Sequence, residues 1–252
     1  MARRTKVEAL ETRNRLLDAA ERLFQAKGVT STTLGDIATA AGTTRGAVYH
    51  HFKDKADLFN AMMERVTLPM EDALAEMAKD AGEQQDPLQS LRQVMLHALH
   101  QIAHDERTRR VFEVAMQKVE RTDEMRAVHE RHVQVLNECQ ALTRTALREA
   151  VHRQGGALSI SLPAATLGLH ALIDGLIHNW LLDPQAFELA RIGRQTLDAY
   201  LRGLGFELPW ARRASARTAQ KRVRSSGAGS TGRRRQAMGD ATPTTPPTAQ
   251  NT

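Results

Sequence analysis

The segment at residues 33–55, TLGDIATAAGTTRGAVYHHFKDK, most constrains what this 252-residue chain can fold into. Its apolar residues recur at helical spacing, and Thr33 and Asp36 are spaced as a capping box at a helix start. Gly42 can adopt the positive φ that often ends a helix. The pattern predicts two short helices joined by a tight turn, then the start of a third. This is a helix-turn-helix, whose second helix enters a DNA major groove.

The second helix of the motif carries side chains suited to DNA on its outer face. We predict that Thr43 caps this helix, that it runs from about Thr44 to His50, and that Ala47 and Val48 face inward. Arginine can bond guanine at two atoms, threonine can contact bases, and tyrosine and histidine suit phosphates. The residues left on the outside are Thr44, Arg45, Gly46, Tyr49 and His50.

The third helix of the motif begins with a cation. Asp54 is predicted to be its N-cap, which places Lys55 in the first turn, where a positive charge opposes the helix dipole. An exposed lysine there would be favourable if a phosphate lay at the helix N-terminus, because such termini bind anions. We therefore predict a phosphate contact for Lys55, with a solvated lysine as the alternative.

The positive charge of the chain is unevenly distributed. Residues 211–252 hold nine Arg or Lys and one acid, residues 1–60 carry a net +3, and residues 61–210 carry −5. DNA binding should therefore be local to the N-terminal head, because electrostatic affinity depends on clustered cations. The tail at 211–252 is rich in polar and small residues, so we expect it to be disordered.

Targeting and redox signals point to the cytoplasm. The single cysteine, Cys139, allows no internal disulfide and fits a reducing compartment. The N-terminus has no apolar segment typical of a signal peptide. The most apolar stretch, 167–182, is too short and too polar to span a bilayer, so we expect no membrane partner.

Helical periodicity runs almost throughout the chain, and no stretch alternates as a strand does, so we predict an all-α fold. Pro69 is expected to kink or break a helix that begins near Lys55, and Gly82–Pro87 is expected to be a polar joint. We expect a DNA-binding domain at 1–55, a ligand-binding and dimerisation domain at 56–210, and the tail at 211–252. Helices are predicted over about 6–27, 34–41, 44–50, from 55 into the seventies, 87–104, 107–119, 124–153, 163–182 and 186–204.

The predicted helix at 163–182 is apolar on most of its faces. A core covers only one face of a helix, so this helix must bury another face as well. A second copy of the chain is the economical answer, because readers of the major groove commonly work as two-fold dimers. The alternative is a central helix in a monomeric bundle.

Other chemistry is not indicated by the residues. His97, His100 and His104 recur at helical spacing, as do His129 and His132, but no acid or cysteine completes a metal site. No Ser-His-Asp arrangement, phosphate loop or pair of catalytic carboxylates stands out. We therefore expect neither an enzyme nor a bound cofactor.

Three segments carry a resemblance to a known family. They are TTLGDIATAAGTTRGAVYHHFKDKADLF at 32–59, DERTRR at 105–110 and ALIDGLIHNWLLDP at 171–184. The chain resembles the TetR family of one-component repressors over about residues 3–205, and most closely its AcrR-like branch, which controls multidrug efflux pump genes. The resemblance implies a TetR-like fold of nine helices. Its eighth and ninth helices would form the dimer interface, and its fourth to eighth would enclose a drug pocket.

The resemblance also implies which residues bind. The DNA-contacting positions would be Thr33, Thr43, Thr44, Arg45, Gly46, Tyr49, His50 and Lys55. The pocket would be lined by Leu91, Val94, Met95, Ala98, Phe112, Met116, Cys139, Thr143, His170, Ile173, Asp174 and Ile177. Apolar residues at helical spacing are equally consistent with plain core. Asp174 is the leading candidate for a ligand contact, because a carboxylate in an apolar helix needs a partner, either a ligand or a structural hydrogen bond.

Three functional hypotheses follow. The first is a dimeric repressor that binds a palindromic operator at an efflux operon and is released by a hydrophobic small molecule. The second keeps the fold but responds to a metabolite, such as an acyl thioester or an aromatic acid. The third is a non-specific architectural DNA binder driven by the basic tail, whose affinity would collapse when 211–252 is deleted.

Overall fold

The computed structural model describes residues 2–80 and 86–210, with side chains from residue 6 onward except those of 70–80. By its internal contacts the chain divides into two compact units, Met1–Glu207 and Leu208–Thr252, and the fold described here is that of the first. The expectation of a disordered tail at 211–252 lies outside the described residues, as does most of the polar joint expected at Gly82–Pro87.

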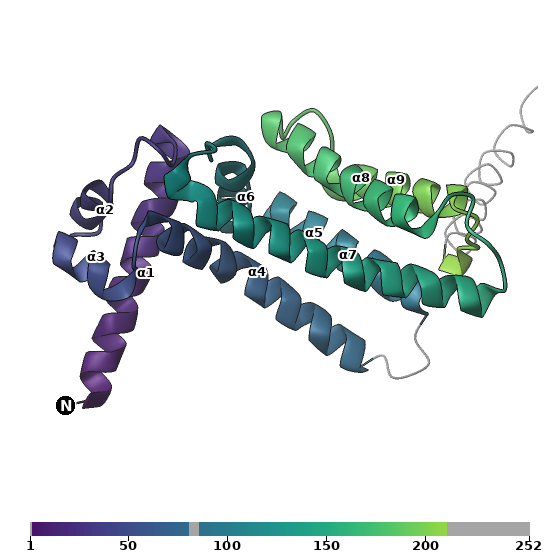
Figure 1. The fold of residues 1–252 in the computed structure, drawn as a ribbon, viewed down its shortest axis with the longest axis horizontal. Helices are drawn as coiled ribbons and strands as arrows, with labels where there is room; N and C mark the ends of the chain where they lie inside the picture. Colours follow the sequence, from purple (N-terminus) through teal and green to yellow (C-terminus); the bar gives the residue numbers. More distant parts are fainter. Residues whose placement is uncertain (1, 81–85, 211–252) are drawn as a thin grey trace, which may run out of the picture. The chain divides into compact units, whose positions relative to one another are not determined.

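The described residues are almost entirely helical, and they contain no strand, as the sequence predicts. The helices are α1 (Ala2–Lys27), α2 (Leu34–Ala40), α3 (Arg45–His51), α4 (Lys55–Asp80), α5 (Pro87–His104), α6 (Glu106–Gln117), the short 3-10 helix η1 (Asp123–Met125), α7 (Arg126–Gln154), α8 (Leu162–Leu182) and α9 (Leu189–Gly203). In Figure 1, α2 and α3 lie beside α1 at one end, and α8 and α9 run side by side at the other.

Local sequence signals explain most helix ends. Pro87 and Pro163 stand in the first turns of α5 and α8, where a missing N–H costs nothing. Gly155 ends α7 with φ 67°, in the left-handed region that favours glycine. Of the kink or break expected at Pro69, the break does not occur, because α4 continues through it to Asp80. Proline removes only one backbone hydrogen bond, and packing of α4 against α1, α6 and α7 outweighs that loss.

One apolar core joins the DNA-binding segment to the rest of the molecule. It contains Phe24 of α1, Val48 of α3 and Phe59 of α4, and it extends to Val111 of α6 and Val128 of α7. The N-terminal head is thus attached to the helical body by burial of apolar surface rather than by a linker. The domain boundary expected at residue 55 coincides with the first residue of α4.

A second core lies among α5, α8 and α9, and it includes Leu99, Ile177, Trp180 and Leu189. Two glycines let these helices approach closely. A Cβ on Gly168 of α8 would overlap the Tyr200 hydroxyl of α9, and a Cβ on Gly193 of α9 would overlap Leu99 of α5. The separation of these helices therefore depends on positions without a side chain.

Candidate DNA-binding and effector sites

The helix-turn-helix segment at residues 33–55 is termed the reading motif. Its first helix, α2, begins with the predicted capping box. The Thr33 hydroxyl accepts a hydrogen bond from the Asp36 backbone N–H at 3.1 Å, and the Thr33 backbone N–H donates to the Asp36 carboxylate at 3.0 Å. The Thr33 hydroxyl also donates to this carboxylate at 2.8 Å, and the two bonds that the carboxylate accepts from Thr33 lower the pKa of Asp36. Gly42 adopts φ 66°, as predicted for the turn that follows.

The second helix, α3, begins one residue later than predicted. Thr44 is the N-cap, because its hydroxyl accepts a hydrogen bond from the Ala47 backbone N–H at 3.2 Å. The prediction that Thr43 caps the helix is wrong, since its backbone N–H donates to the Ala38 carbonyl at 2.9 Å and so closes the turn. Val48 is fully buried and Ala47 partly buried, so the predicted inner face is confirmed.

The outer face of α3 carries the predicted DNA contacts. Arg45 donates a hydrogen bond to the Tyr49 hydroxyl at 3.2 Å, and its guanidinium lies 5.7 Å from the centre of the tyrosine ring. The arginine is thereby held along the exposed face of the helix. The exposed residues of this region are Thr33, Thr44, Arg45, Gly46, Tyr49 and His50, whereas Thr43 is partly buried.

Lys55 is not at an open helix end, so the prediction of an exposed lysine is wrong. Its side chain is 6% exposed, and the ammonium donates to the carbonyls of Val29 and Thr32 at 3.1 and 3.0 Å. It also contacts the Thr30 carbonyl at 3.3 Å and pairs with Glu124 at 3.0 Å. The ammonium is thus used to fix the α1–α2 loop to the body, which leaves no free donor for a phosphate.

The N-terminus of α4 is otherwise built as predicted. Asp54 accepts a hydrogen bond from the Asp57 backbone N–H at 2.8 Å, which confirms Asp54 as the cap. The Asp57 carboxylate in turn accepts from the Lys53 backbone N–H at 2.9 Å. The exposed cation at this helix start is therefore Lys53, two residues before the lysine that the sequence favoured.

The polar residues predicted for the pocket gather between α7 and α8. The Thr143 hydroxyl lies 3.0 Å from Nε2 of His170, and burial lowers the pKa of His170, with Asp174 opposing that shift. Asp174 is exposed, yet desolvation by the surrounding protein raises the pKa of its carboxyl, opposed by the nearby His170 and His132. Three of the predicted polar residues therefore share one seam of the helix pair.

The apolar residues predicted for the pocket are more dispersed. Ile177 belongs to the core of α5, α8 and α9, and Phe112, Met116 and Ile173 pack against it. Cys139 is exposed on α7. The remaining predicted residues lie on α5, where Leu91 and Met95 are buried and Val94 and Ala98 are partly buried.

Helix α8 leaves large apolar side chains in solvent at both ends. Leu167 is 59% exposed and Leu182 is 63% exposed. This is the helix that the sequence marked as apolar on too many faces for one core. Exposed leucines on such a helix are typical of a surface that another chain covers.

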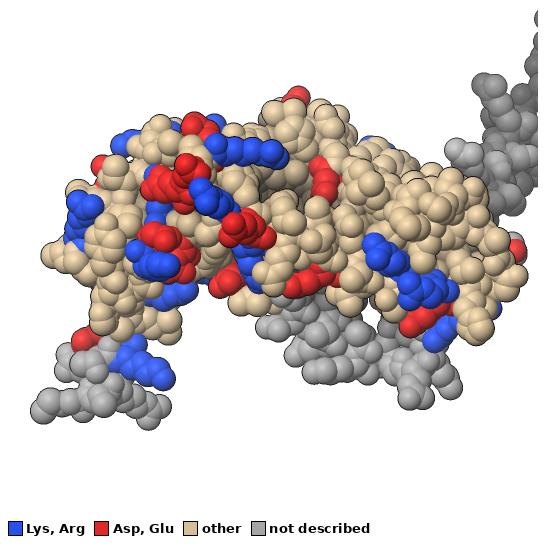
Figure 2. Space-filling view, viewed as in Figure 1, with Lys and Arg blue, Asp and Glu red and all other residues tan. Residues whose placement is uncertain are grey.

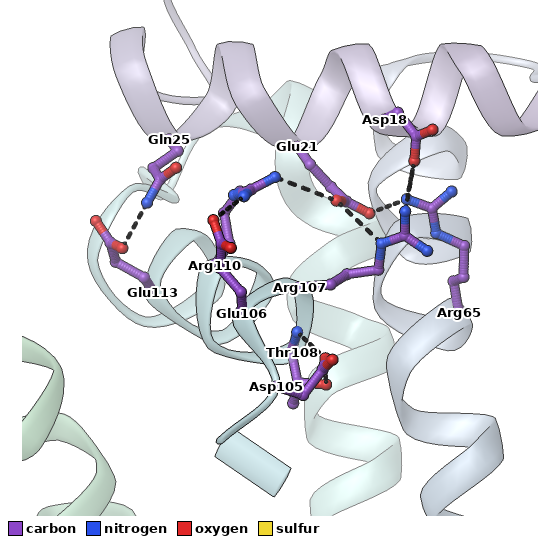
Figure 3. A network of polar contacts seen from close by, with 10 residues as sticks. All are labelled: Asp18, Glu21, Gln25, Arg65, Asp105, Glu106, Arg107, Thr108, Arg110 and Glu113. Carbon is purple, nitrogen blue, oxygen red and sulfur yellow. Dashed lines mark hydrogen bonds and ion pairs between the residues drawn. The ribbon is translucent and has the colours of Figure 1, made fainter. Parts of the chain in front are cut away.

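Sequence reasoning missed a cluster of charged residues at the junction of α1, α4 and α6. It joins Asp18 and Glu21 to Arg65, Arg107 and Arg110, as Figure 3 shows. The partners lie 44 to 89 residues apart, and no local pattern pairs residues at such separations. Among the described side chains no three potential metal ligands come together, and no described helix is long and apolar enough to cross a bilayer.

Comparison with known proteins agrees with this architecture. The sequence model described as "Bacterial regulatory proteins, tetR family" matches residues 16–62, and that described as "MAATS-type transcriptional repressor, C-terminal region" matches residues 86–206. The regulator AcrR of Shigella flexneri is 39% identical over 195 residues, which cover 77% of this chain and 89% of AcrR.

Two solved structures are similar over most of the chain. NalD, the secondary repressor of the MexAB-OprM multidrug efflux pump in Pseudomonas aeruginosa, has 38% identity and a TM-score of 0.69, covering 78% of this chain and 98% of NalD. SmeT in complex with triclosan has 34% identity and a TM-score of 0.64, covering 76% and 90%. SmeT is the repressor of the Stenotrophomonas maltophilia multidrug efflux pump SmeDEF.

Proposed function

The chain belongs to the TetR family of bacterial transcriptional regulators, and on that premise we propose that it represses a multidrug efflux operon. It binds a palindromic operator as a homodimer, and a hydrophobic small molecule bound in the helical body releases it. Because operator DNA lies in the bacterial cytoplasm, the protein acts there. The family comprises regulators of transcription, so no catalytic step is part of the proposal.

The proposal of DNA binding rests on the exposed polar face of α3. Its backbone is fixed by the Thr44 cap and by the buried Val48, while Arg45, Tyr49 and His50 remain exposed. A seven-residue helix with this arrangement supports direct contact with base edges through Arg45 and with phosphates through the others. Lys55 is not among the proposed phosphate contacts, because its ammonium is already bound to loop carbonyls and to Glu124.

The apolar surface of α8 supports the dimer. Burying Leu167 and Leu182 against a second copy removes apolar area from water, which is favourable at about 25 cal/mol per Å². A two-fold dimer carries two α3 helices, and half-sites about one helical turn apart can then be read together. A palindromic operator is the DNA counterpart of that symmetry.

The seam between α7 and α8 supports the effector site. Its polar groups are Thr143, His170 and Asp174, and the same helix α8 carries Ile173 and Ile177, which belong to or pack against the neighbouring apolar core. A ligand with an apolar body and one hydrogen-bonding group suits such a lining. The relatives named in connection with efflux pumps, NalD and SmeT, and the triclosan bound to SmeT, favour drugs over metabolites as effectors.

The direct test is a gel shift with DNA from upstream of the neighbouring genes, with triclosan as the probe for release. We expect retarded DNA at nanomolar protein and its release at micromolar triclosan. If DNA binding persists in triclosan, native mass spectrometry of the purified protein tests the metabolite alternative through any acyl thioester or aromatic acid that co-purifies. Binding without sequence preference that disappears when 211–252 is deleted would support the architectural alternative instead.

A further inference from the structure

Glu21 is a buried carboxylate in the helix that carries the DNA-binding head. It lies on α1 and is 1% exposed, and the DNA-reading face of α3 does not include it. Asp18 and Gln25 lie on the same side of α1, at spacings of three and four residues. This row faces α4 and α6, the two body helices that α1 packs against.

Both body helices supply arginines to the two carboxylates of α1. From α4, Arg65 hydrogen-bonds Glu21 and also reaches Asp18 at 2.8 Å. From α6, Arg107 pairs with Asp18 at 3.0 Å and lies 3.6 Å from Glu21. Arg110 lies 3.9 Å from Glu21. Figure 3 shows Glu21 between Arg110 of α6 and Arg65 of α4, with the Asp18 carboxylate above Arg65 and Arg107.

Glu21 contacts the two body helices unequally, and one buried nitrogen of the cluster has no hydrogen-bond partner among the described residues. Glu21 is hydrogen-bonded by Arg65 of α4 but only approached by Arg107 and Arg110 of α6. Arg110 makes its shorter contact, 2.8 Å, with Glu106 of its own helix. The Nε of Arg65 is buried without a hydrogen-bond partner among the described residues. The position of α1 therefore determines how closely Glu21 approaches the arginines of each of the two body helices.

Cohesion alone does not account for this cluster. The apolar core already joins α1 to α4 and α6 through residues such as Phe24, Phe59 and Val111. A buried ion pair adds little net stability over apolar packing of the same volume, because its charges lose their water. What it adds is direction, since a guanidinium and a carboxylate attract strongly only in a narrow range of geometries.

We propose that Glu21 and Asp18 are positioning residues for operator binding. They fix the orientation of α1, and with it that of α3, relative to α4 and α6. In a dimer this orientation determines the separation of the two reading helices, and so the half-site spacing that the protein accepts. The inference rests on the proposed function, because it requires a dimer that reads a two-fold operator.

The test measures spacing selectivity, which would not change if these residues contributed only to the stability of the fold. The full wild-type chain selects its operator from a random DNA library, and Kd is then measured for that operator and for versions with one base pair added or removed between half-sites. Each change rotates and shifts one half-site relative to the other. The ratio of the altered to the optimal Kd is the spacing selectivity.

The main variant is Glu21→Gln, which keeps the side-chain shape but removes the charge. Its matched control is Asp198→Asn in α9, where the carboxylate pairs with Arg92 of α5 at 2.6 Å and lies away from α1. Both substitutions remove one buried charge from a pair between helices. The second test variant is Arg107→Ala, whose side chain is 49% exposed and whose loss the fold tolerates better.

We expect Glu21→Gln and Arg107→Ala to lower the spacing selectivity by about fivefold, at the low end of coupling between sites in proteins. Asp198→Asn should keep the wild-type ratio. Thermal unfolding and sedimentation establish that each variant is folded and dimeric, and if Glu21→Gln does not fold, Arg107→Ala decides. Wild-type selectivity in a folded, dimeric Arg107→Ala or Glu21→Gln overturns the inference. If the wild type itself selects no two-fold site, the proposed function fails first.

Discussion

The reading motif and the α7–α8 pair place their polar groups in opposite ways. In α2 and α3 the caps Thr33 and Thr44 bond residues three positions away, and the side chains proposed to contact DNA are exposed. In the α7–α8 pair, His170 has its partner Thr143 on another helix, 27 residues away. The first region is specified by short-range chemistry, whereas the second exists only once helices have packed.

The largest loss of operator affinity is expected from changes to the proposed dimer surface on α8. Changing both Leu167 and Leu182 to Arg should disrupt the dimer, because two charges would be buried in an apolar contact. A monomer has one reading helix, so operator affinity should fall by more than about 100-fold. Sedimentation velocity and gel shift measure the two effects. Leu142→Arg on α7, also at an exposed leucine, is the control and should remain dimeric; a dimer that survives the double change would contradict the α8 interface.

The next prediction concerns Lys55, which lies in the reading motif but is buried and bound to residues distant in sequence. Lys55→Ala should lower the free energy of unfolding by about 3 kcal/mol, because three loop carbonyls and Glu124 lose a buried cation. Urea unfolding measures this loss. The exposed Lys53→Ala should have little effect on stability. Unchanged stability with weakened binding to all DNA would restore the phosphate role to Lys55.

Arg45→Ala tests the reading face itself. We expect operator affinity to fall by about 1–3 kcal/mol and specificity to relax at one base pair, with stability unchanged. Binding measured against operators substituted at each position locates that base pair. Tyr49→Phe removes the hydrogen bond that holds Arg45 and should produce a smaller loss of affinity. If Arg45→Ala binds its operator as the wild type does, the assignment of the outer face is wrong.

The smallest effect is a pH dependence of the α7–α8 seam. Burial lowers the pKa of His170 below its value of about 6.5 in the unfolded chain. The unfolded chain therefore binds more protons between the two pKa values, so stability falls as pH drops below about 6.5. His170→Asn should unfold with a weaker pH dependence in that window, measured by urea unfolding at pH 7.5 and pH 5.5. An unchanged dependence would assign it to other histidines.

The sequence predicts the fold well because its signals are local. Caps, glycine turns and prolines lie within a few residues of what they control, and the predicted bounds of α5 are the observed ones. The errors at Thr43 and Lys55 have different causes. Thr43 and Thr44 are neighbouring threonines that can each cap α3, and the backbone N–H of Thr43 instead closes the local turn on Ala38. The partners of Lys55 lie in the α1–α2 loop and at Glu124, which only packing brings close.

The cluster of charged residues at the junction of α1, α4 and α6 could not be predicted, because only packing brings its partners together. Asp18, Glu21 and Arg65 read as ordinary charged positions on amphipathic helices, and nothing in the local pattern marks Glu21 as buried. Figure 2 shows acidic and basic side chains interleaved over the part of the surface that carries α1, α4 and α6. In the sequence, the buried Glu21 has the same pattern of neighbours as such exposed charges. For the pocket, the positions follow from family resemblance, while the pairing of Thr143 with His170 follows from helix packing.

Because Lys55 is buried, its rate of chemical modification measures how often the α1–α2 loop opens. Reagents that acylate amines attack an accessible, deprotonated amine, and the folded protein withholds Lys55 while Lys53 stands exposed two residues away. The ratio of modification at these neighbours therefore reports how often the α1–α2 loop separates from α4. Peptide mass spectrometry could read that frequency in the resting protein and on DNA, without a label or a known effector.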